Sequence, residues 1–238
     1  MQIDPAYAHA LAEMLRESGH DPSALGRIPT GPLDENEFLS LCTRAVSITG
    51  DRALGLRFGA TLQLGGHGVL GHALMSCRTL KQAAELLVRH NPLRSQNGRV
   101  RLAFEGERTI LSFTPAFEVP GAPHFLCDMF FAAATNGIRQ LLGRELARAD
   151  IELAYYPDVP SEEYDRYLRV PVRFWQPANR LNWPPHIMDA PLHPPGLSTA
   201  LAYPPHCTPL PPPLASALVH VLCVPLLLLS CPRPSPSP

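Results

Sequence analysis

Proline and charge divide this 238-residue chain into two unequal parts near residue 190. Of its 28 prolines, 14 fall in residues 191–238, where proline interrupts the hydrogen bonding of both helices and sheets. After Asp189 the only Asp, Glu, Lys or Arg is Arg233. We therefore expect one folded domain of ordinary size at residues 1–192 and a disordered Pro/Leu-rich tail at residues 193–238.

Charge and cysteine usage exclude several classes of protein for the body. Residues 1–190 carry 19 basic and 21 acidic side chains, whereas a nucleic-acid footprint needs clustered Lys and Arg. The 6 cysteines form no C-x-x-C pair and match no zinc spacing, and no secretory signal begins the chain. These features predict a cytoplasmic protein with reduced thiols and no structural metal.

Helical patterns dominate the first ninety residues. Three expected helix starts carry capping residues, which are Asp4 before Pro5, Asp34 with Glu37, and Thr79 with Gln82. The apolar stripes that follow are Tyr7, Leu11, Met14 and Leu15; Phe38, Leu41, Ala45 and Ile48; Leu54 and Phe58; and Leu80, Ala84, Leu87 and Val88. Gly19, Gly50 and Asn91-Pro92 are the expected helix ends, and a glycine-rich passage over residues 65–71 should enter a further short helix.

The middle of the chain changes to strand periodicity. Alternating residues from Val100 to Phe104 and from Thr109 to Phe113 predict an antiparallel hairpin. The longest expected helix follows Pro123, ends at Gly143, and has Leu126, Met129, Phe130, Ala133, Gly137 and Leu141 on one face. Strands at 151–155, 170–174 and 179–183 and a short helix capped by Ser161 complete an α+β fold, with N-terminal helices before a small mixed or antiparallel sheet packed with the long helix.

Gly66-x-Gly68-x-x-Gly71 matches the letters of a dinucleotide-binding turn. Such a turn needs a buried strand before it and an acidic residue at a strand end about 20 residues later. Residues 61–64 are too short and too polar for that strand, and Glu85 falls within an expected helix. We therefore expect these glycines to allow close backbone packing or positive φ, and we expect no nucleotide cofactor.

Other residues able to carry chemistry lack a supporting pattern. His67, His72 and Cys77 are spaced by five and five, so they cannot share one helix face as metal ligands. Glu162 and Glu163 fit a solvated helix face better than an acid–base pair. Six aromatic residues cluster in the sequence, and they fit either core packing or the wall of a small-molecule pocket: Tyr155, Tyr156, Tyr164, Tyr167, Phe174 and Trp175. No catalytic residue is identified, and we expect no enzyme.

Three stretches of residues 1–192 resemble the N-terminal effector-sensing, arabinose-binding-like region of bacterial AraC-type transcriptional regulators. They are residues 54–59 running into 68–80; the hairpin that ends at Phe113; and residues 171–174, 179–181 and 189–192. The resemblance implies a domain that binds a small metabolite or mediates homodimerisation, with effector residues left unspecified. It also implies a following domain with two helix-turn-helix units, which read DNA in the major groove.

Residues 193–238 do not match that second domain, because they offer one arginine and frequent prolines. We therefore expect a truncated regulator with no DNA-binding residues in this chain. The tail fits a shifted reading frame in a GC-rich gene better than a membrane anchor, since the apolar run at 214–229 is short and contains His220 and Pro225. Two alternatives stay open for the body, namely a stand-alone ligand-binding or dimerisation module without a DNA role, and a small enzyme.

Overall fold

A computed structural model describes residues 3, 5–94 and 98–192 of the chain. Asp4 and the expected tail lie outside these described residues, as do the frameshift and membrane-anchor interpretations of that tail. The expected boundary at residue 192 therefore stays a prediction. In the described part of the chain, no helix is both long enough and apolar enough to cross a membrane.

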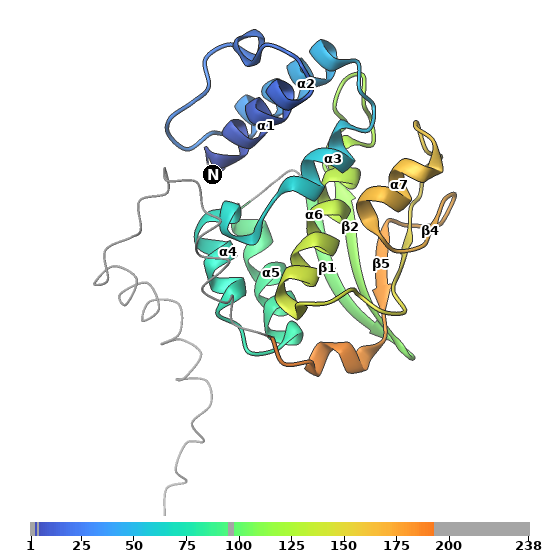
Figure 1. The fold of residues 1–238 in the computed structure, drawn as a ribbon. Coiled ribbons are helices and arrows are strands. Elements are labelled where there is room, and N and C mark those ends of the chain that lie inside the picture. Colours follow the sequence, from blue (N-terminus) through green and yellow to red (C-terminus); the bar gives the residue numbers. More distant parts are fainter. Residues whose placement is uncertain (1–2, 4, 95–97, 193–238) are drawn as a thin grey trace, which may run out of the picture. The chain divides into compact units, whose positions relative to one another are not determined.

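Seven α-helices, three short 3-10 helices and five strands make up the described fold (Figure 1). The helices are α1 (Ala6–Glu17), η1 (Pro22–Leu25), α2 (Glu35–Thr49), α3 (Leu54–Thr61), η2 (Leu64–His67), α4 (Gly68–Met75), α5 (Leu80–Arg94), α6 (Phe125–Leu142), α7 (Ser161–Leu168) and η3 (Pro185–Asp189). The strands are β1 (Gly98–Glu105), β2 (Arg108–Pro115), β3 (Asp150–Glu152), β4 (Val172–Arg173) and β5 (Arg180–Trp183). The expected α+β class is confirmed.

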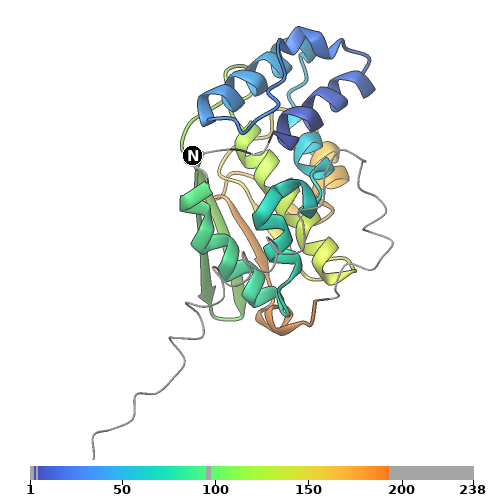
Figure 2. The same ribbon diagram turned by 90° about the vertical axis from the view of Figure 1, so that its left-hand side faces the viewer.

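The five strands form one mixed sheet in the order β1-β2-β5-β3-β4. The predicted hairpin pairs β1 with β2, and β5 then lies antiparallel to both β2 and β3. Only β3 and β4 run parallel. The long helix α6 crosses the sheet, and α3 lies beside α6 on the same side of the strands (Figures 1 and 2).

Helix ends follow the sequence signals at most positions. The capping box of α2 forms in both directions, because Asp34 Oδ1 accepts from the Glu37 amide and Glu37 Oε2 accepts from the Asp34 amide, each at 2.8 Å. Gly50 and Gly143 end α2 and α6 in the left-handed conformation that glycine adopts without strain. Thr79 Oγ1 accepts from the Gln82 amide at 3.3 Å, while the Gln82 side chain accepts from the Arg78 amide.

Several predicted boundaries were wrong. Helix α5 continues beyond Pro92 to Arg94, two residues past its expected end. Ser161 is the first residue of α7 rather than its cap, and it makes no side-chain capping bond. The strand expected at 151–155 ends at Glu152, since the Ala154 amide donates to the Asn179 side chain instead of to a neighbouring strand.

Helices α3 and α6 approach each other without intervening side chains. An added Cβ at Gly55 would lie 2.6 Å from the Phe125 carbonyl oxygen, and one at Gly59 would lie 2.3 Å from that of Met129. The Asn136 amide donates to the carbonyls of Ala60 and Leu62 at 3.0 and 2.9 Å. These bonds satisfy the carboxyl end of α3, whose last carbonyls have no partner within their own helix.

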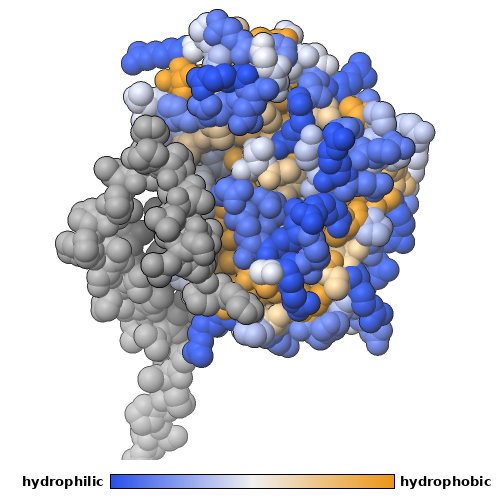
Figure 3. Space-filling model, viewed as in Figure 1, coloured by the Kyte–Doolittle hydropathy of each residue, from blue (hydrophilic) through white to orange (hydrophobic). Residues whose placement is uncertain are grey.

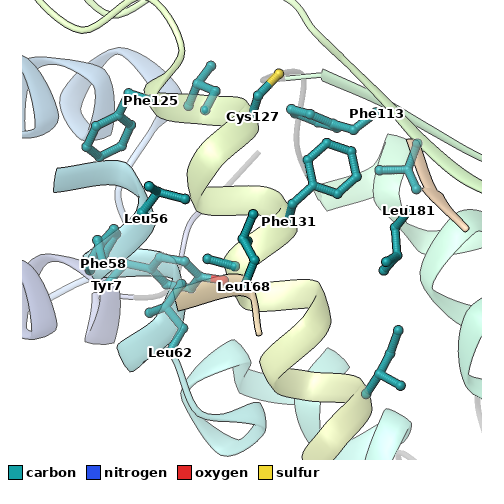
Figure 4. Close-up of a cluster of buried hydrophobic side chains, with 14 of the residues drawn as sticks. Tyr7, Leu56, Phe58, Leu62, Phe113, Phe125, Cys127, Phe131, Leu168 and Leu181 are labelled. Carbon is teal, nitrogen blue, oxygen red and sulfur yellow. The ribbon is translucent and has the colours of Figure 1, made fainter. Parts of the chain in front are cut away.

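The hydrophobic core extends across both sides of α6. Figure 4 shows Phe58 and Leu56 on α3 next to α6, and Phe113 and Leu181 of the sheet on the other side of it. Phe131 is fully buried, as are Phe58 and Leu181. Burial of these side chains is the main term that holds the sheet, α6 and α3 together.

Candidate functional site

A cavity of about 200 Å³ lies between the helices and the sheet. A single water molecule needs only about 10–15 Å³, so the space is large enough for a small organic ligand. The residues that line it come from eight elements and the segments next to them: Ile3, Tyr7, Phe38, Leu62, Leu64, His67, Leu70, Leu74, Leu80, Ala83, Ala84, Leu87, Leu111, Phe113, Leu126, Met129, Phe130, Ala133, Ala134, Gly137, Ile138, Leu141 and Trp183.

Helix α6 supplies the largest share of this wall. All six residues that the sequence places on one apolar face of the long helix line the cavity: Leu126, Met129, Phe130, Ala133, Gly137 and Leu141. Alanines and a glycine at the centre of this face leave space that larger side chains would occupy. The periodicity of the sequence predicts this apolar face of the helix, but it does not distinguish the wall of a cavity from a packed core.

Two aromatic residues connect α6 to the sheet at this wall. The rings of Phe113 on β2 and Phe130 on α6 are stacked, with centroids 4.3 Å apart and an interplanar angle of 11°. Trp183 on β5 also lines the cavity, and its indole N–H donates to the Met188 sulfur at 3.3 Å. The stack fixes the side of the cavity that faces the sheet.

Part of the cavity wall is exposed to solvent. The side chains of Leu70, Leu87, Met129, Phe130, Ala133 and Ala134 line the cavity and are only partly buried. Hydrophobic surface is visible beneath the hydrophilic layer that α1 and α2 form (Figure 3). A ligand that covers apolar surface gains about 25 cal/mol for each Å² removed from water, so the exposed wall favours occupation by an apolar group.

Tyr7 and His67 form the polar feature of the cavity. The Tyr7 hydroxyl is hydrogen-bonded to Nδ1 of His67, although the two residues are 60 positions apart in the chain. The Tyr7 ring is held by edge contacts with Phe38 and Phe58, at centroid distances of 5.8 and 6.2 Å. The sequence singled out His67 only as a candidate metal ligand and Tyr7 only as a core residue.

The cavity wall carries few other groups able to make polar contacts. Among the described residues that line it, none is Asp, Glu, Lys, Arg, Asn, Gln, Ser or Thr. Hydrogen bonding by side chains is thus left to Tyr7, His67 and the indole of Trp183. The cavity therefore suits a mainly apolar ligand.

The glycine-rich motif packs against the backbone next to the cavity. It follows α3 rather than a strand, and Glu85 lies in α5. An added Cβ at Gly71 would lie 1.7 Å from the Leu64 carbonyl oxygen, which confirms close packing there. At Gly66 nothing lies within 4 Å and φ is not positive, so neither expected reason applies to that residue.

His67, His72 and Cys77 do not form one site. His72 and Cys77 line a separate surface depression together with Asp189, and the Cys77 thiol donates to the Ala73 carbonyl at 3.4 Å. His67 lines the cavity with Tyr7 instead. Within the described ranges, no three His, Cys, Asp or Glu side chains are close enough to hold a metal ion.

The six clustered aromatic residues lie elsewhere, and none is among the described residues that line the cavity. Tyr164 is buried and makes an edge contact with Phe174 at 5.0 Å, so core packing is confirmed for this pair. Tyr156 and Trp175 are 66% and 75% exposed. Trp175 has a φ of 58°, and its side chain points into solvent rather than into the core.

Asp128 on α6 is a buried carboxyl with a raised pKa. It is 3% exposed, and burial raises its pKa to about 7, while hydrogen bonds from Tyr155 and Tyr164 act in the opposite direction. Next to it, His124 stacks on the Tyr155 ring at 3.8 Å, and burial lowers the His124 pKa. A carboxyl of this kind is typical of some catalytic sites, but Asp128 is not among the residues that line the cavity.

Comparison with known proteins agrees with the expected resemblance. A family model described as the arabinose-binding domain of AraC transcription regulators, N-terminal, matches residues 9–192. The ornithine utilization regulator of Pseudomonas aeruginosa is 26% identical over 200 residues, which cover 80% of this chain and 59% of that protein. The chain thus spans about three fifths of the length of that relative.

A solved structure has the same fold. The crystal structure of the transcriptional regulator CdpR from Pseudomonas aeruginosa superposes with a TM-score of 0.62 and 18% sequence identity. The match covers 99% of this chain and 73% of that chain. At this level of identity the similarity concerns the fold alone.

Proposed function

The chain belongs to the AraC family of transcription regulators, through the arabinose-binding N-terminal domain that residues 9–192 match, and from this we propose that the cavity beside α6 is its effector-sensing site. The observation that carries the proposal is a partly exposed apolar cavity with a polar pair, Tyr7 and His67, at its wall. Apolar pockets with a few placed polar groups are typical of small-molecule sites. We assign no catalytic step to this site and place its action in the cytoplasm.

The cavity is well placed to translate ligand binding into a change of the domain. Its wall combines residues of α1, α4, α5, α6 and β2, which lie in different parts of the fold. A ligand that contacts all of them stabilises the arrangement in which these elements surround it. A sensor shifts its conformational equilibrium only by its difference in affinity for the two arrangements, and such a wall provides that difference.

DNA recognition, in this proposal, is made by a helix-turn-helix part of the regulator and not by the sensing domain. The nearly balanced charge of residues 1–190 supports this division, because phosphate contacts need an excess of Lys and Arg. We infer that effector binding, together with possible pairing of two domains, controls how the reading helices meet their half-sites. A ligand-binding module without a DNA role is the alternative.

Filling the cavity tests the proposed site. Ala133→Leu adds three carbons at the centre of the α6 wall, and Ala147→Leu makes the same change at an exposed position that does not line the cavity. In a thermal-shift screen of the purified 238-residue chain against amino acids, sugars, aromatic acids and uncharged aromatic compounds such as phenols and indoles, a ligand should raise the melting temperature of the parent and of Ala147→Leu. It should not raise that of Ala133→Leu.

Two results would contradict the proposal. One is an equal ligand-induced shift in Ala133→Leu and in the parent, which would locate the site outside the cavity. The other is the absence of any stabilising compound for the parent. The melting temperature of each unliganded variant serves as the folding control, since a filled cavity should not lower it.

A further inference from the structure

We propose that the cavity takes an uncharged, mainly apolar ring compound with one hydrogen-bonding group, which contacts the Tyr7–His67 pair. This inference rests on the proposed function, because it names the class of ligand for the same site. It follows from the chemistry of the cavity wall, the size of the space and the position of its polar groups.

The wall disfavours a charged ligand. No Asp, Glu, Lys or Arg is found among the described residues that line the cavity, so a buried ammonium would meet no carboxylate there, and a buried carboxylate would meet no cationic side chain other than a protonated His67. Removing an ion from water without such a partner costs several kcal/mol or more. Amino acids, and diamino acids above all, are poorly suited to this space.

The wall also disfavours a sugar. A pentose carries several hydroxyl groups, and each needs a hydrogen bond when it leaves water. Tyr7, His67 and Trp183 are the lining residues whose side chains form hydrogen bonds, and the Trp183 N–H already donates to Met188. Most hydroxyl groups of a pentose would therefore face aliphatic or aromatic carbon.

The size of the cavity limits the apolar ligands that fit. Apolar cavities of about 150 Å³ accommodate benzene, so a space of about 200 Å³ suits a single ring with a short substituent or a small bicyclic compound. The aromatic residues Phe113, Phe130 and Trp183 offer ring faces and edges to such a molecule. Phenol represents this class in the test.

Tyr7 and His67 determine where the polar group of the ligand lies. A hydroxyl group can both donate and accept hydrogen bonds, so whichever tautomer His67 adopts, the Tyr7 hydroxyl can form a hydrogen bond with the hydroxyl of a phenol. The ring contacts with Phe38 and Phe58 and the hydrogen bond to His67 keep that oxygen in place. The part of the ligand that points away from this pair contacts mainly the aliphatic and aromatic side chains of the wall.

Calorimetric titration of the purified 238-residue chain with matched probes tests this class. Phenol and toluene have similar shapes and differ in a hydroxyl group. Phenol should bind the parent saturably, and Tyr7→Phe should weaken phenol binding roughly three- to tenfold while leaving toluene binding unchanged. Tyr156→Phe, at an exposed position that does not line the cavity, should leave both affinities unchanged. Arabinose and ornithine should produce no saturable heat.

The outcomes separate the ligand class from the site. If arabinose or ornithine binds saturably and Ala133→Leu abolishes that binding, the site is correct and the class is wrong. The class is also wrong if Tyr7→Phe changes phenol and toluene binding equally. If phenol binds the parent and Ala133→Leu equally well, the proposed site itself fails.

Discussion

The Tyr155 hydroxyl donates a hydrogen bond of 2.6 Å to Oδ1 of Asp128, which joins the chain after β3 to the first half of α6. Asp128 is 3% exposed and lies beside Tyr164 as well. Burial disfavours its charged form, so its pKa is raised to about 7 even though both tyrosine hydroxyls donate to the carboxylate. The protonation state of this buried group therefore changes near neutral pH.

The raised pKa of Asp128 predicts a stability that falls as the pH rises. An ordinary Asp has a pKa of about 3.9, so between about pH 4 and pH 7 the folded chain holds a proton that the unfolded chain has lost. The contribution of this proton to the free energy of unfolding therefore declines between about pH 4 and pH 7, by at most about 1.4 kcal/mol per pH unit. Above about pH 7 it no longer changes.

Asp128→Asn removes this titration and isolates its effect. The free energy of unfolding of the variant, minus that of the parent, should increase from pH 5 to pH 7 and then level off. Urea unfolding at pH 5, 6, 7 and 8 measures the difference. Asp165→Asn, at an exposed position of α7, is the control for the substitution itself. Parallel pH profiles for Asp128→Asn and the parent would contradict the expected titration.

Tyr155→Phe should destabilise the fold at neutral pH. The variant leaves the buried Asp128 carboxyl without one of its hydrogen-bond donors, and such a loss costs about 1–3 kcal/mol. Tyr156→Phe makes the same chemical change at the neighbouring, 66% exposed position and should change stability by less than about 0.5 kcal/mol. Equal unfolding free energies for Tyr155→Phe and Tyr156→Phe would show that the hydrogen bond contributes nothing net.

The glycine-rich motif offers a matched pair of substitutions. Gly71→Ala places a Cβ 1.7 Å from the Leu64 carbonyl oxygen, so the backbone must shift, and we expect a loss of about 1–3 kcal/mol. Gly66→Ala meets nothing within 4 Å and has no positive φ to preserve, so it should be neutral or slightly stabilising. Thermal and urea unfolding of the two variants measure the contrast. If Gly66→Ala lost more stability than Gly71→Ala, the close packing would lie at Gly66 and not at Gly71.

A buried phenylalanine on α6 and an exposed one on β1 should differ in their contribution to stability. Phe131→Ala removes a ring that is 0% exposed, and deletions of this kind typically cost about 3–5 kcal/mol. Phe104→Ala removes a ring on β1 that is 56% exposed, which should cost less than about 1 kcal/mol. Urea unfolding of both variants gives the two costs, and similar values would mean that the core does not centre on α6.

Signals confined to neighbouring residues predicted much of the fold. The Asp34–Glu37 capping box, the glycine ends of α2 and α6, and the alternating residues of the β1–β2 hairpin depend on contacts within one element or between adjacent ones. The cavity face of α6 could be identified for the same reason, because helical periodicity places its residues on one side. These features can be predicted without knowing which residues far apart in the sequence contact each other.

Features that depend on distant contacts could not be predicted. The bond between Tyr7 and His67 joins residues 60 positions apart, and neither side chain carries a local signal of the other. The aromatic residues between Tyr155 and Trp175 cluster in the sequence, yet Tyr164 is buried whereas Trp175 is 75% exposed at a left-handed backbone position.

The contact between α3 and α6 through Gly55 and Gly59 has a mechanical consequence. Side chains that separate two helices can change rotamer and absorb a small displacement, but here backbone meets backbone. The Asn136 amide additionally connects α6 to the carboxyl end of α3. We therefore expect the two helices to move together, so that a rotation of α6 would carry α3 with it and displace the amino-terminal helix α1, which packs against α3.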